Sequence, residues 1–268
     1  MVGELDPKAV PDYFSRAGTV EQWWSPDTGP LAFHYDAELK VIDEQLVVAQ
    51  NSKVLDVGTG RGRFAIHMAA KGCRVVAVDI NSEMLTFAGQ AAVEQGVDEG
   101  IEFRASSAED LSGIDEKAFD VVLCMELFDH LPDLGKALGQ MRQRLHADGS
   151  FVFTYVPSES LYGLLGNIYR WLRRKFRAQS VMISRTYSLP EIEEYLAANG
   201  FELDRHFGVG VLCINAQTRL FRRNPLSLAV LALARAEARF RPYHEGAILS
   251  RYGAHVVGIA KPVDRKGN

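Results

Sequence analysis

A glycine-rich turn is the segment whose residue types and spacing best indicate chemistry. It reads Asp56-Val57-Gly58-Thr59-Gly60-Arg61-Gly62 and follows a short apolar run. Glycines let the backbone bend tightly and approach a ligand closely because they carry no Cβ atom. The free amides at the start of a following helix add hydrogen-bond donors. The segment therefore predicts a buried strand, a ligand-binding turn and a helix in succession.

Asp79 is the second informative residue because it follows the next predicted strand, at residues 74–78. An acid in that position can accept hydrogen bonds from two ribose hydroxyls, so the turn and Asp79 together predict a nucleoside-containing ligand. The dinucleotide fingerprint Gly-x-Gly-x-x-Gly is not met, since Arg63 occupies its last position. Asp56 would repel a pyrophosphate but attract an ammonium group. We therefore expect a ligand that is zwitterionic at that end.

Polar residues also end a later apolar run, at Glu126, Asp129 and His130. Doubly wound folds bind ligands at the edge where such strands end. His130 is the best-placed candidate base, because an imidazole can take a proton from a hydroxyl or an ammonium group near neutral pH. The alternative is that His130 caps the next helix or packs beneath the ligand.

The elements that must position these residues alternate between β-branched runs and amphipathic helical stretches from residue 53 to 156. This alternation predicts an α/β, Rossmann-like fold with a seven-stranded, mostly parallel sheet, helices on both faces and two helical insertions. Strands are expected at residues 54–57, 74–78, 101–104, 119–124, 150–155, 201–208 and 255–260. A helix should begin at the capping box Ser188 to Glu191 and end at Gly200. Another should begin at Pro225 and end before Pro242.

One domain is expected over residues 1–268. We divide it into N-terminal cap helices (1–50), a cofactor-binding half (51–156), an amphipathic lid insertion (157–187) and a C-terminal half (188–268) with a helical insertion at 215–250.

Composition excludes several classes of protein. The net charge of -4 and the pI near 6.0 argue against a nucleic-acid-binding protein. The three cysteines lie far apart and indicate neither a disulfide framework nor a zinc knuckle, which favours a reducing cytoplasm. No run reaches the roughly 20 apolar residues that span a bilayer, and the N-terminus lacks the pattern of a secretory signal.

The glycine turn, Asp79 and the segment Ile101 to His130 resemble the class I S-adenosylmethionine-dependent methyltransferases. This resemblance implies S-adenosylmethionine as cofactor, with Asp79 at the ribose and Ile80 and Met84 beside the adenine. Segment 103–111 resembles the adenine-binding stretch of the family, but Ser107 replaces the Asp that commonly holds the adenine amino group. The cofactor-binding residues that we expect are Asp56, Gly58, Thr59, Gly60, Gly62, Asp79, Ile80, Met84, Ser107, Ala108 and Met125.

Within that family, the spacing of Glu126, Asp129 and His130 resembles the Glu-x-x-Glu-His segment of the ubiquinone-biosynthesis O-methyltransferases. The resemblance implies a divalent cation such as magnesium, which would lower the pKa of an acceptor hydroxyl. The alternative is that these side chains bind only one another or water.

The N-terminal segment resembles the same enzymes through Trp23-Trp24-Ser25-Pro26 and Leu31-Ala32-Phe33-His34. This resemblance makes His34 a second candidate base. Aromatic residues of the segment are expected to form a flap that excludes water from the reaction, or simply to pack on the sheet. They are Tyr13, Phe14, Trp23, Trp24, Phe33 and Tyr35.

The stretch at residues 160–177 has apolar residues on one side of a helical wheel and Arg170, Arg173, Arg174 and Arg177 on the other. Such a helix can lie at a membrane surface or close an acceptor pocket. We expect a cytoplasmic protein, with peripheral membrane contact through 160–177 and a lid over the acceptor pocket as open alternatives for this segment.

We expect O-methylation of a small, lipophilic phenolic acceptor that resembles a quinone precursor. The insertion at 215–250 departs from the ubiquinone-type pattern, so other acceptors stay open. The alternatives are N- or C-methylation of a secondary metabolite, a relative that uses the cofactor without methyl transfer, and an NAD-dependent oxidoreductase.

Overall fold

The computed structural model describes residues 32–115, 117–161, 163–164, 167–168, 171, 185–211, 225–246 and 248–263. Several residues singled out in the sequence lie outside this part of the chain. They are Tyr13, Phe14, Trp23, Trp24 and the four arginines of segment 160–177, together with residues 215–224 of the second insertion. The backbone at Phe33 and His34 is described as helical, but their side chains are not described.

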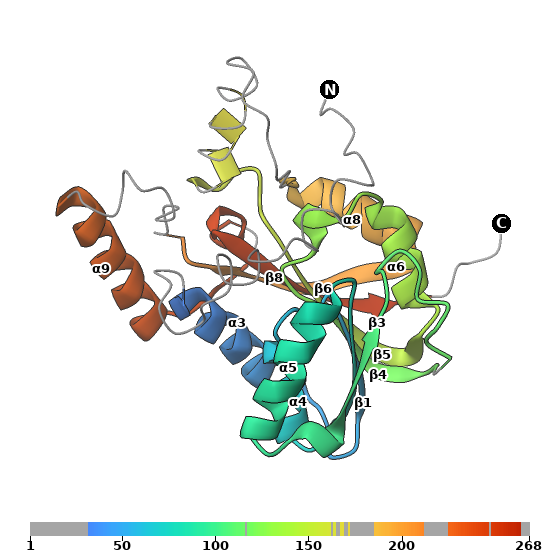
Figure 1. The fold of residues 1–268 in the computed structure, drawn as a ribbon. Coiled ribbons are helices and arrows are strands. Elements are labelled where there is room, and N and C mark those ends of the chain that lie inside the picture. The colour runs from blue at the N-terminus through green and yellow to red at the C-terminus, as the bar shows by residue number, and fades with distance from the viewer. Residues whose placement is uncertain are drawn as a thin grey trace.

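One mixed sheet organises the fold, with the strand order β3-β2-β1-β4-β5-β8-β6-β7 (Figure 1). Strands β1 to β5 are parallel, whereas β8 is inserted antiparallel between β5 and β6. The seven long strands confirm the predicted sheet, and β7 adds a two-residue edge strand that the sequence did not indicate. The strands are β1 (Lys53–Val57), β2 (Arg74–Asp79), β3 (Ile101–Ala105), β4 (Phe119–Cys124), β5 (Leu145–Tyr155), β6 (Phe201–Val209), β7 (His244–Glu245) and β8 (His255–Pro262).

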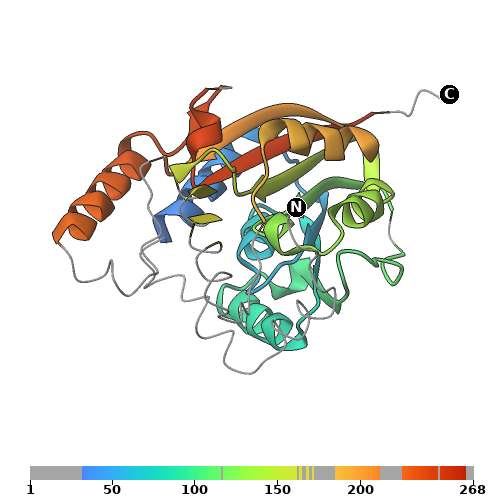
Figure 2. The ribbon, with the colours of Figure 1, turned by 90° about the horizontal axis from the view of Figure 1, so that it is seen from above.

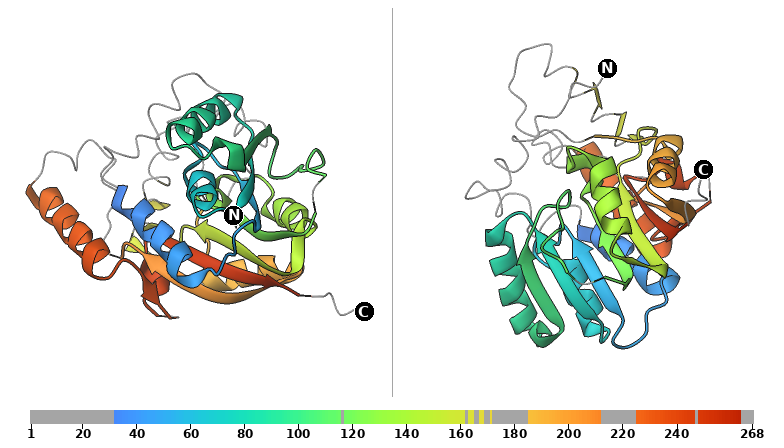
Figure 3. Two further views of the ribbon diagram at one scale, coloured as in Figure 1. Left: turned by 90° about the horizontal axis from the view of Figure 1, so that it is seen from below. Right: turned by 90° about the vertical axis from the view of Figure 1, so that its right-hand side faces the viewer.

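Helices cover both faces of the sheet, as predicted. Helices α3 and α4 pack on one face, with α5 beside α4, and α6 and α8 pack on the other. Helix α9 lies beside α3 and projects to one side of the molecule (Figures 2 and 3). The helices are α3 (Ala32–Gln45), α4 (Arg63–Ala70), α5 (Ser82–Glu94), α6 (Leu134–Arg142), α8 (Leu189–Ala198) and α9 (Pro225–Phe240), with 3-10 turns at Asp98–Gly100, Phe128–His130 and Ser250–Tyr252.

The predicted capping box begins α8. The Ser188 hydroxyl accepts from the backbone N–H of Glu191, and the Glu191 carboxylate accepts from the backbone N–H of Ser188 at 2.7 Å. Gly200 follows the helix with φ 79°, a left-handed conformation that glycine adopts without steric cost. Local sequence therefore defines both ends of this helix.

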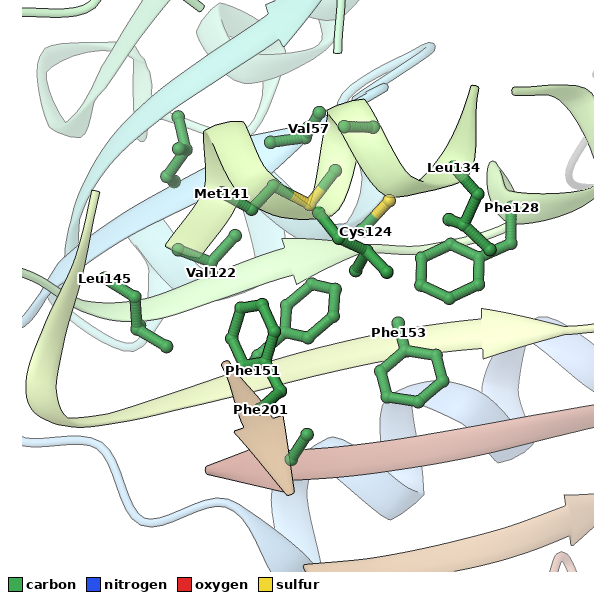
Figure 4. Close-up of a cluster of buried hydrophobic side chains, with 14 of the residues drawn as sticks. Val57, Val122, Cys124, Phe128, Leu134, Met141, Leu145, Phe151, Phe153 and Phe201 are labelled. Atoms are coloured by element: carbon green, nitrogen blue, oxygen red, sulfur yellow. The ribbon is translucent and has the colours of Figure 1, made fainter. Parts of the chain in front are cut away.

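Stacked aromatic rings fix the turn after β4 to the sheet. The rings of Phe128 and Phe153 are parallel with centroids 4.8 Å apart, and Phe151 and Phe153 stack at 5.1 Å. Figure 4 shows Phe128 facing Phe153, with Leu134 of α6 beside them. The backbone carbonyl of Phe128 also accepts from the Tyr187 hydroxyl at 3.2 Å. The 3-10 turn that carries His130 is thus held rigidly against the core.

Among the described residues, no helix has both the length and the apolar character that crossing a lipid bilayer requires.

Candidate functional site

A cavity of about 800 Å³ opens at the carboxyl edge of the parallel strands. Its walls come mainly from the turns after β1, β2, β3 and β4, which the parallel sheet brings to one edge. Eleven of the predicted site residues line it: Gly58, Thr59, Gly60, Asp79, Ile80, Met84, Ser107, Ala108, Met125, Glu126 and His130. The structure therefore gathers residues from four separate stretches of sequence around one space.

Asp79 and the glycine turn are in direct contact. The Asp79 Oδ2 atom accepts from the backbone N–H of Gly60 at 2.8 Å, and Oδ1 accepts from the N–H of Asn81 at 2.9 Å. Burial raises the pKa of Asp79, although these backbone bonds oppose the shift. Each carboxylate oxygen has about two acceptor positions, so each can take a further donor from a ligand.

The three glycines of the turn have left-handed backbones but different surroundings. A Cβ atom on Gly58 would lie 2.7 Å from the Leu127 side chain, and one on Gly62 would lie 2.9 Å from the Ala88 Cβ. A Cβ on Gly60 would meet no atom within 4 Å, because this glycine borders the cavity. Gly58 and Gly62 are thus needed for packing, while Gly60 leaves open space for a ligand.

Asp56 lies behind the turn and is not among the residues that line the cavity. Its side chain is buried, and its Oδ2 atom accepts from the Thr59 hydroxyl at 2.7 Å. Burial raises the pKa of Asp56 to about 6, with the charge of Asp79 adding to the shift. Asp56 therefore contacts the glycine turn through the hydroxyl of Thr59.

His130 lines the cavity from the last residue of the 3-10 helix after β4. Its Nε2 atom lies 3.4 Å from Asp129 Oδ2. A carboxylate at this position can orient an imidazole. His34, the other candidate base, lies in α3, and its side chain is outside the described part of the structure.

A buried cluster of ionisable side chains adjoins the cavity at Glu126. The Nδ1 atom of His255 lies 2.8 Å from Glu38 Oε1 and 3.5 Å from Glu126 Oε1. Arg63 Nη2 lies 3.7 Å from the other oxygen of Glu126, and the Arg63 guanidinium stacks 3.5 Å from the centre of the Tyr35 ring.

Electrostatics in this cluster are strongly perturbed. Burial, together with the charge of Glu38, raises the pKa of Glu126 to about 8. Burial disfavours the charged form of His255, but the hydrogen bond and charge of Glu38 outweigh it and raise the pKa of His255 to about 9. Such perturbed groups beside a cavity are typical of functional sites.

The predicted metal set differs from the arrangement in the structure. Among the described residues, the group of His, Cys, Asp and Glu side chains that meets the spacing of metal ligands consists of Glu38, Glu126 and His255. Glu126 was predicted, but Asp129 and His130 do not belong to this group. They follow Glu126 in the chain but turn with the 3-10 helix, where they lie beside one another.

Comparisons with known proteins agree with the fold and with the resemblance to methyltransferases. Residues 55–153 match the family model of the methyltransferase domain. The ubiquinone biosynthesis O-methyltransferase of Alkalilimnicola ehrlichii is 30% identical over 159 residues, which are 55% of this chain and 61% of that protein. The chain thus spans about three-fifths of the length of this relative.

Two solved structures share the fold over nearly the whole chain. A methyltransferase from Thermotoga maritima, described as a possible histamine N-methyltransferase, has a TM-score of 0.61 at 20% identity. The aligned part is 94% of this chain and 99% of the Thermotoga chain. The magnesium protoporphyrin IX methyltransferase of Synechocystis has a TM-score of 0.60 at 17% identity, covering 96% of this chain and 100% of its own. Residues 55–153 therefore form a methyltransferase domain, with the fold of the class I, S-adenosylmethionine-dependent methyltransferases.

The cavity of this methyltransferase domain fits the cofactor that the family uses. Ile80 is 47% exposed although it is a large apolar side chain, and with Met84 it offers an apolar wall to an adenine ring. Asn81 caps α5 by accepting from the N–H groups of Glu83 and Met84, which fixes the turn after Asp79. Gly60 leaves open space beside Asp79.

Ser107 departs from the family pattern in structure as well as in sequence. Its hydroxyl accepts from the backbone N–H of Glu109 at 3.2 Å, so this side chain stabilises its own turn. A carboxylate at this position would accept from an adenine amino group, whereas the hydroxyl already has a backbone partner. Ser107 and Ala108 both border the cavity.

Sequence reasoning missed Glu38 and His255 and noted Arg63 only as an obstacle to NAD binding. Glu38 and His255 are separated by 217 positions, and no local motif connects them. The one signal for Arg63 was its position directly after the glycine turn, at the first residue of α4.

Proposed function

We propose that this protein transfers the methyl group of S-adenosylmethionine to a small, lipophilic acceptor that carries a phenolic hydroxyl. The observation that carries the proposal is the contact between Asp79 and Gly60 at the rim of a cavity of about 800 Å³. In this arrangement Asp79 accepts from the ribose hydroxyls, Ile80 and Met84 contact the adenine, and the glycine turn holds the methionine end.

The acceptor site adjoins the cofactor near His130. Apolar side chains line this part of the cavity, among them Met125, Leu127 and Leu131, which favours a lipophilic acceptor. The similar proteins named for ubiquinone biosynthesis are O-methyltransferases, and this supports a hydroxyl on a quinone-precursor-like ring.

The sulfonium of the cofactor supplies an activated methyl group. The protein contributes alignment of the two reactants, which can lower the barrier by about 7–11 kcal/mol. His130 removes the proton of the acceptor hydroxyl, with Asp129 stabilising the imidazolium that forms. The rigid aromatic support beneath Phe128 keeps His130 in position.

The test is incubation of the purified protein with methyl-labelled S-adenosylmethionine and a panel of prenylated phenols, catechols and amines. We expect the label on a phenolic oxygen, identified by mass spectrometry. Label on nitrogen or carbon would instead establish the N- or C-methyltransferase alternative. Cofactor binding without methyl transfer to the panel or to an extract of the source cell would favour a non-methylating relative.

The proposal includes contact of segment 160–177 with lipid. Its described apolar side chains are unusually exposed, with Leu164 at 51% and Trp171 at 60%. A peripheral position at a membrane would give the site direct access to a lipophilic acceptor.

A further inference from the structure

Three acidic or imidazole side chains from distant elements converge behind the cavity wall. Glu38 belongs to α3, Glu126 follows β4, and His255 is the first residue of β8. One potential ligand atom from each lies within 4.8 Å of the others. His255 Nδ1 lies between the two carboxylates, 2.8 Å from Glu38 Oε1 and 3.5 Å from Glu126 Oε1. Ligands of a single metal ion lie at comparable distances from one another.

Two carboxylate oxygens of this cluster are buried without a hydrogen-bond partner, Glu38 Oε2 and Glu126 Oε1. The Glu38 side chain is fully buried. An unpaired buried carboxylate oxygen is costly, and native structures nearly always give such an atom a partner. Arg63 does not fill this role for Glu126, because its guanidinium faces the other oxygen, Oε2.

Backbone geometry holds Glu126 in this position. Its φ of 54° is in the left-handed region, which non-glycine residues seldom adopt, and its N–H donates to the Thr154 hydroxyl. Strain of this kind persists where the surrounding structure imposes it, commonly at functional sites. In this backbone conformation the Glu126 side chain lies beside Glu38 and His255.

We propose that Glu38, Glu126 and His255 bind one divalent transition-metal ion, of the Mn²⁺ or Zn²⁺ type. Two carboxylate oxygens and one imidazole nitrogen suit these ions, whereas Mg²⁺ prefers oxygen ligands and water. A divalent ion would give both unpaired oxygens, Glu38 Oε2 and Glu126 Oε1, a positively charged partner.

The proposed site shares Glu126 with the cofactor cavity but does not depend on the identity of the methyl acceptor. Its test therefore measures metal binding alone. Protein stripped with a chelator is titrated with Mn²⁺, and free Mn²⁺ is followed by electron paramagnetic resonance. We expect one bound Mn²⁺ per chain, displaced by Zn²⁺.

Two histidine variants decide which residues bind. His255→Gln should weaken Mn²⁺ binding at least about tenfold, as loss of a ligand does, and Glu38→Gln should act similarly. His130→Gln, which changes the residue of the other candidate set, should leave Mn²⁺ affinity within about twofold of wild type. Circular dichroism of the metal-free variants checks that each is folded.

The wild-type protein provides a measurement that needs no folded variant. With isotope-labelled histidine, Mn²⁺ should broaden the His255 ring resonance before those of the other histidines. The absence of stoichiometric Mn²⁺ binding would overturn the proposal. Broadening of His130 first, or equal affinity in wild type and a folded His255→Gln, would do the same. None of these results bears on methyl transfer, because no turnover is measured.

Discussion

The carboxylate of Asp79 accepts a hydrogen bond from the backbone N–H of Gly60 at 2.8 Å, which ties the end of β2 to the turn after β1. Its second oxygen accepts from Asn81, the residue that caps α5. One side chain therefore couples two strand ends and a helix start. A ligand held by Asp79 is consequently positioned against the glycine turn.

Asp79→Asn should weaken binding of S-adenosylhomocysteine about a hundredfold, because charge-assisted hydrogen bonds to the ribose hydroxyls are lost. The new amide also offers a donor where the carboxylate accepted from a backbone N–H. Isothermal titration calorimetry measures the change. Asp98→Asn, an exposed acid-to-amide change in the 3-10 turn before β3, serves as the matched control. Equal affinities in the two variants would remove the ribose assignment.

Alanine at Gly60 and at Gly62 should have different effects. Gly62→Ala places a methyl group 2.9 Å from the Ala88 Cβ, so its main effect is a loss of stability. Gly60→Ala meets no protein atom but extends into the cavity, so its main effect is weaker cofactor binding. Both carry a left-handed backbone cost of about 1–2 kcal/mol. Denaturant unfolding and cofactor titration of both variants measure the two effects. The assignment is wrong if Gly60→Ala mainly lowers stability and Gly62→Ala mainly weakens cofactor binding.

His130→Gln should slow methyl transfer to a hydroxyl acceptor about a hundredfold while leaving cofactor affinity near that of wild type. The reason is that glutamine cannot accept the acceptor's proton, although it retains hydrogen-bonding atoms. Single-turnover rates with saturating cofactor measure the effect. A parallel loss of cofactor affinity would indicate that His130 only supports the cavity wall.

Asp56 should make stability depend on pH. Because burial raises its folded-state pKa from 3.8 to about 6, the folded protein binds this proton more tightly than the unfolded chain. The unfolding free energy of wild type should therefore rise, relative to Asp56→Asn, as the pH falls from about 7.5 to about 4.5, by roughly 2 kcal/mol. Urea unfolding of both proteins at the two pH values measures this difference. A difference that does not change with pH would mean that Asp56 titrates normally.

Replacing Leu164, Ile168 and Trp171 together by Glu should reduce flotation with vesicles that contain anionic lipid. These exposed side chains supply the apolar contact that a surface-bound helix requires. Leu233→Glu, an equally exposed apolar residue on α9, is the control. A second variant with Glu at Arg170, Arg173, Arg174 and Arg177 tests the electrostatic part. Unchanged flotation in both multiple variants would exclude membrane contact through this segment.

The meeting of the glycine turn and Asp79 could be predicted from the sequence because its determinants are local. The strand, the glycine turn and the following helix are contiguous, and Asp79 comes one crossover later. The capping box of α8 is equally local, since Ser188 and Glu191 interact within a single helical turn. Parallel strands then bring these turns to the same edge by their topology alone.

The cluster of Glu38, Glu126 and His255 was decided by tertiary structure. It requires β8 to insert antiparallel between β5 and β6, because that placement brings the first residue of β8 to the carboxyl edge of the parallel strands. Packing of α3 on the sheet then brings Glu38 to His255. Neither step follows from a local pattern, because burial of distant apolar faces determines both. The sequence thus specified the glycine turn and Asp79 at one edge of the sheet, while long-range packing determined which ionisable groups meet beside them.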